Sequence, residues 1–79
     1  DFKTQDIINN LLNRSYYKSY ENLDENTINF VILKILNILY SIDNYELLKP
    51  FNDIIQILAL NDPNLEIRNY AKKVFKVMQ

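Results

Sequence analysis

The stretch that decides the fold is DPNLEIRNYAKKVFKVM, which runs from Asp62 to Met78. Asp62 is a residue type that accepts hydrogen bonds from the first turn of a helix, and Pro63 fits the first helical position because its missing N–H needs no partner there. Apolar residues then recur at intervals of 4, 3 and 4 residues, which places them on one face of a helix. The stretch predicts a helix over 63–78 with this core face: Ile67, Ala71, Val74 and Met78.

The first half of the chain predicts two further helices. One is expected over residues 5–17 with Thr4 as its cap, because its apolar residues fall in one half of the helical wheel and its asparagines in the other. A polar, acidic loop follows, and Asp24 or Asn26 is expected to cap the next helix. That helix, over 27–41, is apolar round most of its circumference, so we expect it in the middle of a bundle.

The second half predicts a short helix followed by two longer ones. Residues 43–46 fit a capping box that starts at Asp43. Pro50 is expected to end the short helix and to push Lys49 out of the helical region, so a new helix is predicted over 51–60. Its inward side chains are predicted to be Ile54, Ile55, Ile57 and Leu58.

Composition excludes several classes of protein. The 79 residues suffice for one domain with a modest core, and 48% hydrophobic against 24% charged residues is typical of a globular chain. Cysteine and histidine are absent, which removes disulfides and the commonest metal ligands and proton shuttles. We therefore expect no enzyme activity, no metal and no cofactor. Apolar side chains are spaced by 3 and 4 rather than 2, so the fold class is expected to be all-α.

Glycine is also absent, so another residue must take any left-handed turn position. Asparagine tolerates that conformation, and the candidates near the predicted breaks are Asn22, Asn44 and Asn61. The most apolar run, residues 28–42, is fifteen residues long and contains Lys34, so it is too short and too polar to cross a bilayer. No signal peptide is visible and the first residue is not methionine, so we expect an intracellular fragment of a longer chain, cytoplasmic or nuclear.

The sequence also contains a repeat. When Ile28 is placed over Ile67, 39 residues later, the apolar positions of the two helices coincide. Residues 58–78 resemble the second half of a HEAT repeat through Asp62-Pro63, Ile67-Arg68 and Ala71, and the broken helix at Pro50 is similar to an armadillo repeat. This resemblance implies a right-handed bundle of two stacked helical hairpins, over about 4–42 and 43–79, within the superfamily whose periods are about 40 residues.

A second resemblance is to the N-terminal LW-type domain of transcription elongation factor S-II and its relatives, a single helical unit of about this size. The matching positions are Leu47, Leu48, Ile67, Ala71, Lys72, Lys73 and Val74. Both families are non-catalytic scaffolds. The first implies a module that binds a peptide or a partner surface, and the second implies binding of short disordered motifs of the transcription machinery.

The charge is strongly polarised along the chain. Residues 68–79 hold four basic groups and no acid, whereas residues 1–67 hold five basic and ten acidic groups. Arg68, Lys72, Lys73 and Lys76 fall on one arc of the last helix and are our first candidates for binding an acidic peptide. The same cations also complement the helix macrodipole, which is the competing interpretation. Nucleic acid is disfavoured because no aromatics are interleaved on this arc.

Other candidate binding residues have structural alternatives. Arg68 is also expected to bond Asp62 or a nearby acid. Tyr17 and Tyr20 belong to a tyrosine cluster of the kind found in binding hot spots, or else form a hairpin corner. The exposed arc of the second long helix is interrupted by Phe30 and Leu33, which pack on a neighbouring helix or bind a partner. Adjacent Asp24 and Glu25 are expected to serve at a helix start rather than as a catalytic or metal site.

Overall fold

The computed structural model describes all 79 residues and is entirely helical, without a strand. Two short 3₁₀ helices, η1 and η2, interrupt the α-helices. The elements in chain order are α1 (Phe2–Leu12), η1 (Arg14–Ser19), α2 (Glu25–Ile42), α3 (Tyr45–Leu48), η2 (Lys49–Phe51), α4 (Asn52–Asn61) and α5 (Leu65–Val77).

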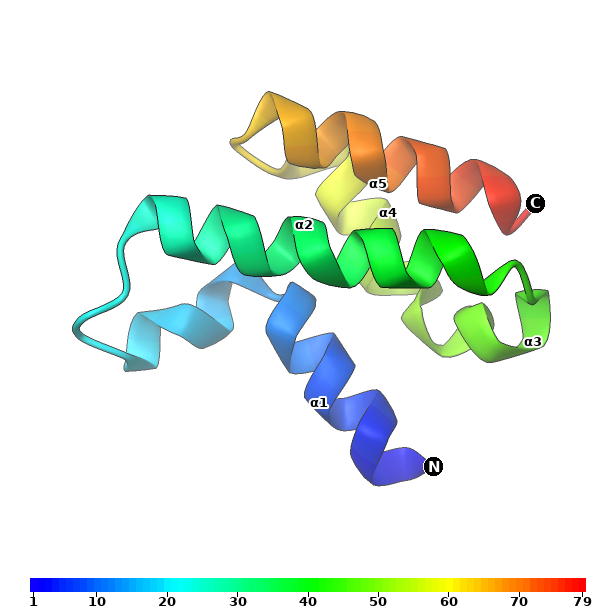
Figure 1. The fold of residues 1–79 in the computed structure, drawn as a ribbon, viewed down its shortest axis with the longest axis horizontal. Coiled ribbons are helices and arrows are strands. Elements are labelled where there is room, and N and C mark those ends of the chain that lie inside the picture. The colour runs from blue at the N-terminus through cyan, green and yellow to red at the C-terminus, as the bar shows by residue number, and fades with distance from the viewer.

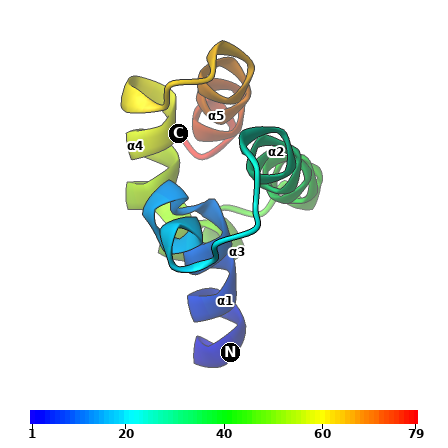
Figure 2. The ribbon, with the colours of Figure 1, turned by 90° about the vertical axis from the view of Figure 1, so that its left-hand side faces the viewer.

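The body of the molecule is formed by α2, α4 and α5, with α5 packed against both of the others. In Figure 1, α2 runs across the middle of the molecule, with α5 above it and α4 behind. Figure 2, viewed from the side, separates α4 from α2 and shows α5 close to both. Helix α1 leaves the body of the molecule toward the N-terminus, so that its first turns project beyond the other helices. The fold is therefore a small helical bundle in which α5 is shared by two packing partners.

One hydrophobic core lies between these helices. All four predicted core residues of the last helix are buried, which confirms the apolar stripe that its spacing predicts. Burying a side chain as large as valine, isoleucine or methionine stabilises a fold by about 1.5–3 kcal/mol. The largest fully buried side chains come from every part of the chain: Leu12, Ile32, Leu36, Leu39, Leu48, Ile55, Ile67 and Val74.

The 39-residue pattern corresponds to packing. Helices α2 and α5 carry the two copies and contact one another. Ile32 and Ala71 occupy equivalent positions and are both fully buried, as are Leu39 and Met78 at 1% and 5% exposure. At one end of the pattern Ile28 is only half-buried although Ile67 is at 0%. The pattern thus marks the core-facing stripe of two neighbouring helices.

The first predicted helix is wrong at both ends. Helix α1 starts at Phe2, and Asp1 rather than Thr4 is its cap, because the Asp1 carboxylate accepts the Thr4 N–H at 2.8 Å. The helix ends at Leu12 because Asn13 is extended and its side chain accepts the Ser15 N–H at 3.0 Å. This local bond competes with helical hydrogen bonding and starts η1 instead.

The turn after α2 differs from its prediction by one residue. The side chain of Asn44, not Asp43, accepts the Leu47 N–H and begins α3. Asp43 is the residue in the left-handed conformation, with φ 46°, so none of the three predicted asparagines takes it. Lys49 stays helical despite preceding proline, because Pro50 sits in the first turn of η2 where no N–H is needed.

The start of α5 also differs from its prediction. Asn64 caps the helix by accepting the Ile67 N–H at 3.0 Å, and the first helical residue is Leu65 rather than Pro63. Asp62 is thereby released for another role. The predicted cap of α2 at Asp24 is confirmed, since its carboxylate accepts the Thr27 N–H at 2.7 Å.

Helix α4 extends over Asn52–Asn61, close to its predicted range, but one of its predicted inward side chains faces solvent. Ile55 is fully buried and Leu58 nearly so, whereas Ile57 is 53% exposed. The face that Ile57 occupies is not covered by another element of the bundle, which leaves apolar surface in contact with water.

Candidate partner-binding surface

The basic arc of α5 divides into groups with different surroundings. Arg68 is half-buried, and its Nη1 donates to the backbone carbonyl of Asp62 at 2.7 Å. The guanidinium therefore closes the turn between α4 and α5, as its structural alternative predicts, although it bonds the Asp62 backbone rather than the carboxylate. A cation held in this way is committed to the fold.

Lys73 contacts two aromatic rings. Its Nζ lies 4.7 Å from the ring centroid of Tyr40 on α2 and 5.5 Å from that of Tyr70. The two rings meet edge to face with centroids 6.1 Å apart, and the Tyr70 hydroxyl donates to Asn37 Oδ1 at 2.6 Å. A cation over aromatic rings contributes about 0.5–1 kcal/mol at exposed sites. Lys73 thus helps to join α5 to α2.

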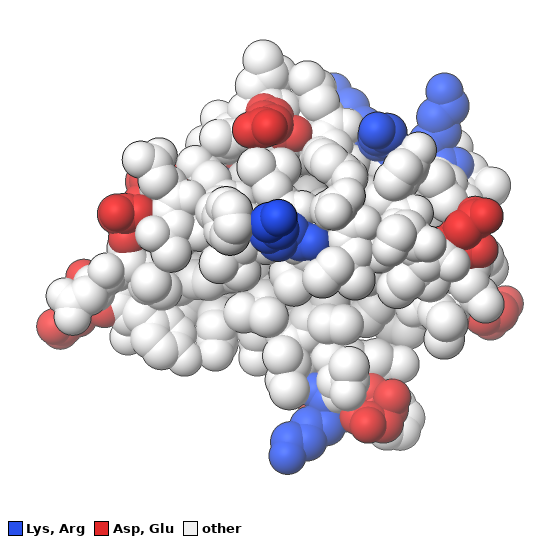
Figure 3. All heavy atoms as spheres, in the orientation of Figure 1, with Lys and Arg blue, Asp and Glu red and all other residues white.

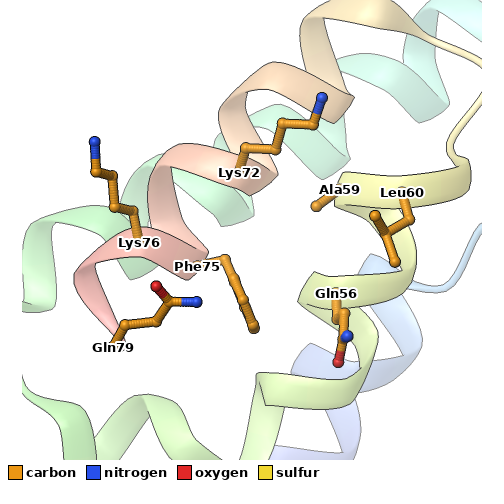
Figure 4. Close-up of a pocket in the computed structure, with 7 residues that line it drawn as sticks. All are labelled: Gln56, Ala59, Leu60, Lys72, Phe75, Lys76 and Gln79. Carbon is orange, nitrogen blue, oxygen red and sulfur yellow. The ribbon is translucent and has the colours of Figure 1, made fainter.

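Lys72 and Lys76 have no such partners. Both ion pairs of the structure belong to Arg14, and neither lysine contacts an aromatic ring as Lys73 does. Their side chains instead line a hollow between α4 and α5, with Figure 4 showing both ammonium groups pointing away from the Phe75 ring. The hollow has a volume of about 340 Å³, and its other lining residues are Gln56, Ala59, Leu60, Phe75 and Gln79.

The floor of this hollow is apolar and part of it is exposed. Ala59 is buried at 5% exposure, Phe75 is half-buried, and Leu60 is 65% exposed. Phe75 enters the space between the two helices and faces Gln56 across it in Figure 4. A hydrophobic floor with two unpaired cations at its rim is a chemical arrangement that accepts an apolar side chain next to a carboxylate.

A second hollow continues the first along α4. It has a volume of about 360 Å³ and shares Gln56 and Leu60 with the lysine-bearing hollow. Its remaining lining residues are Asp53, Ile57 and Asn61, so all of its lining comes from α4 and α5 forms a wall only in the first hollow. We call the two hollows together the α4–α5 groove. No residue of α1 or α2 lines it, although Ile57 and Asn61 at its α4 edge also border a smaller hollow next to the α1–η1 junction.

The charged side chains are unevenly distributed over the molecular surface. Figure 3 shows basic side chains gathered along α5 at the upper right, while much of the same face is uncharged. Acidic side chains lie mainly at the periphery of this view. The separation of charge that the sequence predicts is therefore present on this face of the molecule.

The turn of the α4–α5 hairpin contains a cluster of hydrogen-bonded polar side chains. Arg14 donates from Nε and Nη2 to the two Asp62 carboxylate oxygens, both at 3.0 Å. It also donates to Asn29 Oδ1 at 2.8 Å and to Glu25 Oε2 at 3.2 Å. Asp62 is only 4% exposed and accepts in addition the Asn64 N–H at 3.0 Å. We call this set of residues the Arg14–Asp62 cluster.

The Arg14–Asp62 cluster joins distant parts of the chain. Its members come from the α1–η1 junction, the first turns of α2 and the α4–α5 turn, so it fixes three connections at once. No buried side-chain nitrogen or oxygen in the protein lacks a hydrogen-bond partner. The Asp62 carboxylate accepts three hydrogen bonds, all of them from groups of the fold itself.

The remaining predicted candidates do not line the groove. Tyr17 is 6% exposed and its hydroxyl donates to the Leu11 carbonyl, with burial raising the pKa of that hydroxyl. Tyr20 is half exposed, and its hydroxyl bonds that of Tyr16 at 2.9 Å. This pairing raises the pKa of Tyr16. The tyrosine cluster therefore packs the η1 corner.

The two α2 candidates are also separate from the groove. Phe30 is 60% exposed, and the Nζ of Lys34 lies 5.3 Å from its ring centroid. Leu33 is half-buried against the core. Neither side chain lines a hollow of the structure.

Most of the groove was not identified from the sequence. The missed residues are Asp53, Gln56, Ile57, Ala59, Leu60, Asn61, Phe75 and Gln79. One signal was present: α4 carries more large apolar residues than one buried face requires, so some must be exposed. The orientation of α4 against α5, which decides which ones are exposed, is a tertiary property.

No group of three or more His, Cys, Asp or Glu side chains is arranged to hold a metal ion. None of the helices combines the length and the apolar character that crossing a membrane requires. Comparison with protein-family models, with curated proteins and with solved structures gave no match.

Proposed function

We propose that this protein is a non-catalytic interaction module that binds, in the α4–α5 groove, a partner peptide carrying acidic and apolar side chains. The observation that carries the proposal is that Lys72 and Lys76 stand unpaired at the rim of an apolar hollow. An apolar anchor contributes affinity by burial, and complementary charge fixes register and speeds association.

The macrodipole of α5 accounts for only one of these lysines. Lys76 lies in the last turn, where a cation is stabilised by the partial negative charge of the helix end. Lys72 lies before the last turn, and the macrodipole effect fades beyond that turn. An unpaired cation at Lys72 therefore favours a partner, and we expect it to contribute more to binding than Lys76.

A nucleic-acid function is less well supported at the same place. Proteins that bind nucleic-acid backbones combine several cations with aromatic side chains available for stacking. Only two lysines line the groove, its one aromatic residue, Phe75, is half-buried, and the net charge of the chain is −1. The chemistry fits a peptide better.

The proposed architecture is that of stacked helical hairpins of the HEAT or armadillo type. In its support, α4 and α5 form a hairpin and α2, which carries the earlier copy of the 39-residue pattern, packs beside α5. Repeats of this kind bind partners on helical surfaces and have no catalytic residues. No observation on the groove favours the LW-type domain in particular.

A peptide-display selection tests the proposed function. The immobilised domain is screened against a random peptide library, in parallel with K72E/K76E and with K18E/K49E, a double variant of equal charge change. Lys18 and Lys49 are exposed and do not line the groove. We expect the wild type and K18E/K49E to enrich peptides with acidic and large apolar residues, and K72E/K76E to lose them. Equal enrichment by all three proteins contradicts the proposal.

A further inference from the structure

The walls of the α4–α5 groove restrict the conformation of what binds there. Both walls are α-helices, whose backbone N–H and C=O groups are bonded within their own helix. A peptide recognised as an added strand needs a row of free main-chain groups on its receptor, and two helices provide none. An extended peptide is left with isolated side-chain amides, those of Gln56 and Gln79, in the lysine-bearing hollow. A helical occupant satisfies its own backbone.

The apolar side chains of the groove have the spacing that a helix matches. Ile57 and Leu60 lie three residues apart on α4 and are 53% and 65% exposed. Phe75 completes the apolar surface from the α5 wall. On the α5 side the lining residues run from Lys72 to Gln79, so the part of the groove with two walls is about 10 Å long, which is about two helical turns. A helix with apolar residues at i, i+3 or i+4, and i+7 presents them over that length on one face.

The charges of the groove give its occupant an orientation. Lys72 and Lys76 are four residues apart on α5, which places their side-chain bases about 6 Å apart on one edge. Two carboxylates spaced by three or four residues on a partner helix have the same separation. The α4 edge has no cation and carries Asp53. The two edges thus distinguish the two flanks of an amphipathic helix.

We propose that the groove binds a partner-protein segment as an amphipathic α-helix of about two turns, with its acidic flank on Lys72 and Lys76. This inference rests on the proposed function and adds the conformation of the partner and its charge pattern. The segment pays the entropy of helix formation on binding unless it is helical beforehand, so a preformed helix binds more tightly.

Three synthetic peptides of about 12 residues and equal composition test the inference. The first places its apolar residues at i, i+4 and i+7 with glutamates on one flank. The second alternates apolar and polar residues, as a strand does. The third differs from the first only in the position of its single proline, which is terminal in the first peptide and central in the third. Isothermal titration with the whole protein measures each affinity, and circular dichroism measures helix content. We expect the first peptide to bind at least tenfold more tightly than the others and to gain helix.

The outcomes separate the inference from the proposed function. If the alternating peptide binds as tightly as the helical one, and K72E/K76E weakens both, the helical conformation is refuted while peptide binding in the groove stands. If neither these peptides nor any library peptide binds in a way that depends on Lys72 and Lys76, both proposals are refuted. Amide chemical shifts that move outside 52–61 and 72–79 on addition of the first peptide also refute the inference.

Discussion

The turn of the α4–α5 hairpin and the groove along its helices carry charges in opposite conditions. At the turn, the Arg14–Asp62 cluster buries a carboxylate and gives every polar atom a partner. Along the groove, Lys72 and Lys76 are exposed, unpaired and next to exposed apolar side chains. Charges that are buried and fully bonded act on the fold, whereas removing an exposed, unpaired charge costs the fold little. We therefore assign stability to the Arg14–Asp62 cluster and binding to the α4–α5 groove.

Breaking the Arg14–Asp62 cluster is expected to have the largest effect on stability. Arg14→Ala leaves the Asp62 carboxylate, 4% exposed, without its cation, and such a loss costs about 3–5 kcal/mol. Urea denaturation followed by circular dichroism measures the free energy of unfolding. Glu25→Gln is the matched control, because Glu25 is 77% exposed and its pair with Arg14 is a surface one, costing about 0.5 kcal/mol or less. Similar losses in the two variants break the comparison.

Removing the α5 cap tests the turn on a smaller scale. Asn64→Ala deletes the acceptor for the Ile67 N–H, which costs about 1 kcal/mol. Asn69→Ala on the same helix is exposed and caps nothing, and alanine is the better helix former, so stability is expected to stay equal or rise slightly. The same urea experiment separates them. If Asn64→Ala is as stable as the wild type, Asn64 is not the functional cap of α5.

Acidification affects the start of α2, which lies next to the Arg14–Asp62 cluster. The Thr27 hydrogen bonds hold the pKa of Asp24 below its usual value. A lowered pKa means that the stabilisation is complete above the usual value and is lost as pH falls through the folded one, below about pH 4. Thermal unfolding midpoints between about pH 5 and pH 3 should therefore fall more for the wild type than for Asp24→Asn, which still accepts a bond but does not titrate. Parallel profiles contradict this assignment.

The sequence predicts the core better than the caps. Periodicity depends on which residues must avoid water, so the buried stripe from Ile67 to Met78 follows from spacing alone. Cap positions are harder to predict, because neighbouring residues can have similar capping strength. The predicted caps Asp43 and Asp62 are not the caps; Asn44 and Asn64, one and two residues later, are. The residue that engages the Asp62 carboxylate, Arg14, is 48 positions away in the chain.

The groove depends on tertiary structure in the same way. On a helical wheel, Lys72, Lys73 and Lys76 belong to one basic arc. Their different surroundings come from neighbouring elements. Lys73 lies over the ring of Tyr40 on α2, whereas Lys72 and Lys76 line a hollow together with Leu60 of α4. The rotation of α4 about its axis is set by packing, and it exposes Ile57, which the periodicity of α4 predicts to face inward.

The most direct test of the binding role of the α4–α5 groove is the affinity of a library-selected peptide for the wild type, K72E/K76E and K18E/K49E. Titration calorimetry at low and high salt measures it, with urea denaturation of each protein alongside. We expect K72E/K76E to weaken binding by about tenfold or more, most at low salt, while its free energy of unfolding falls by only about 1 kcal/mol, because Lys76 no longer complements the end of α5. K18E/K49E should bind as the wild type does. Unchanged affinity in a folded K72E/K76E protein would contradict the assignment of the α4–α5 groove to binding.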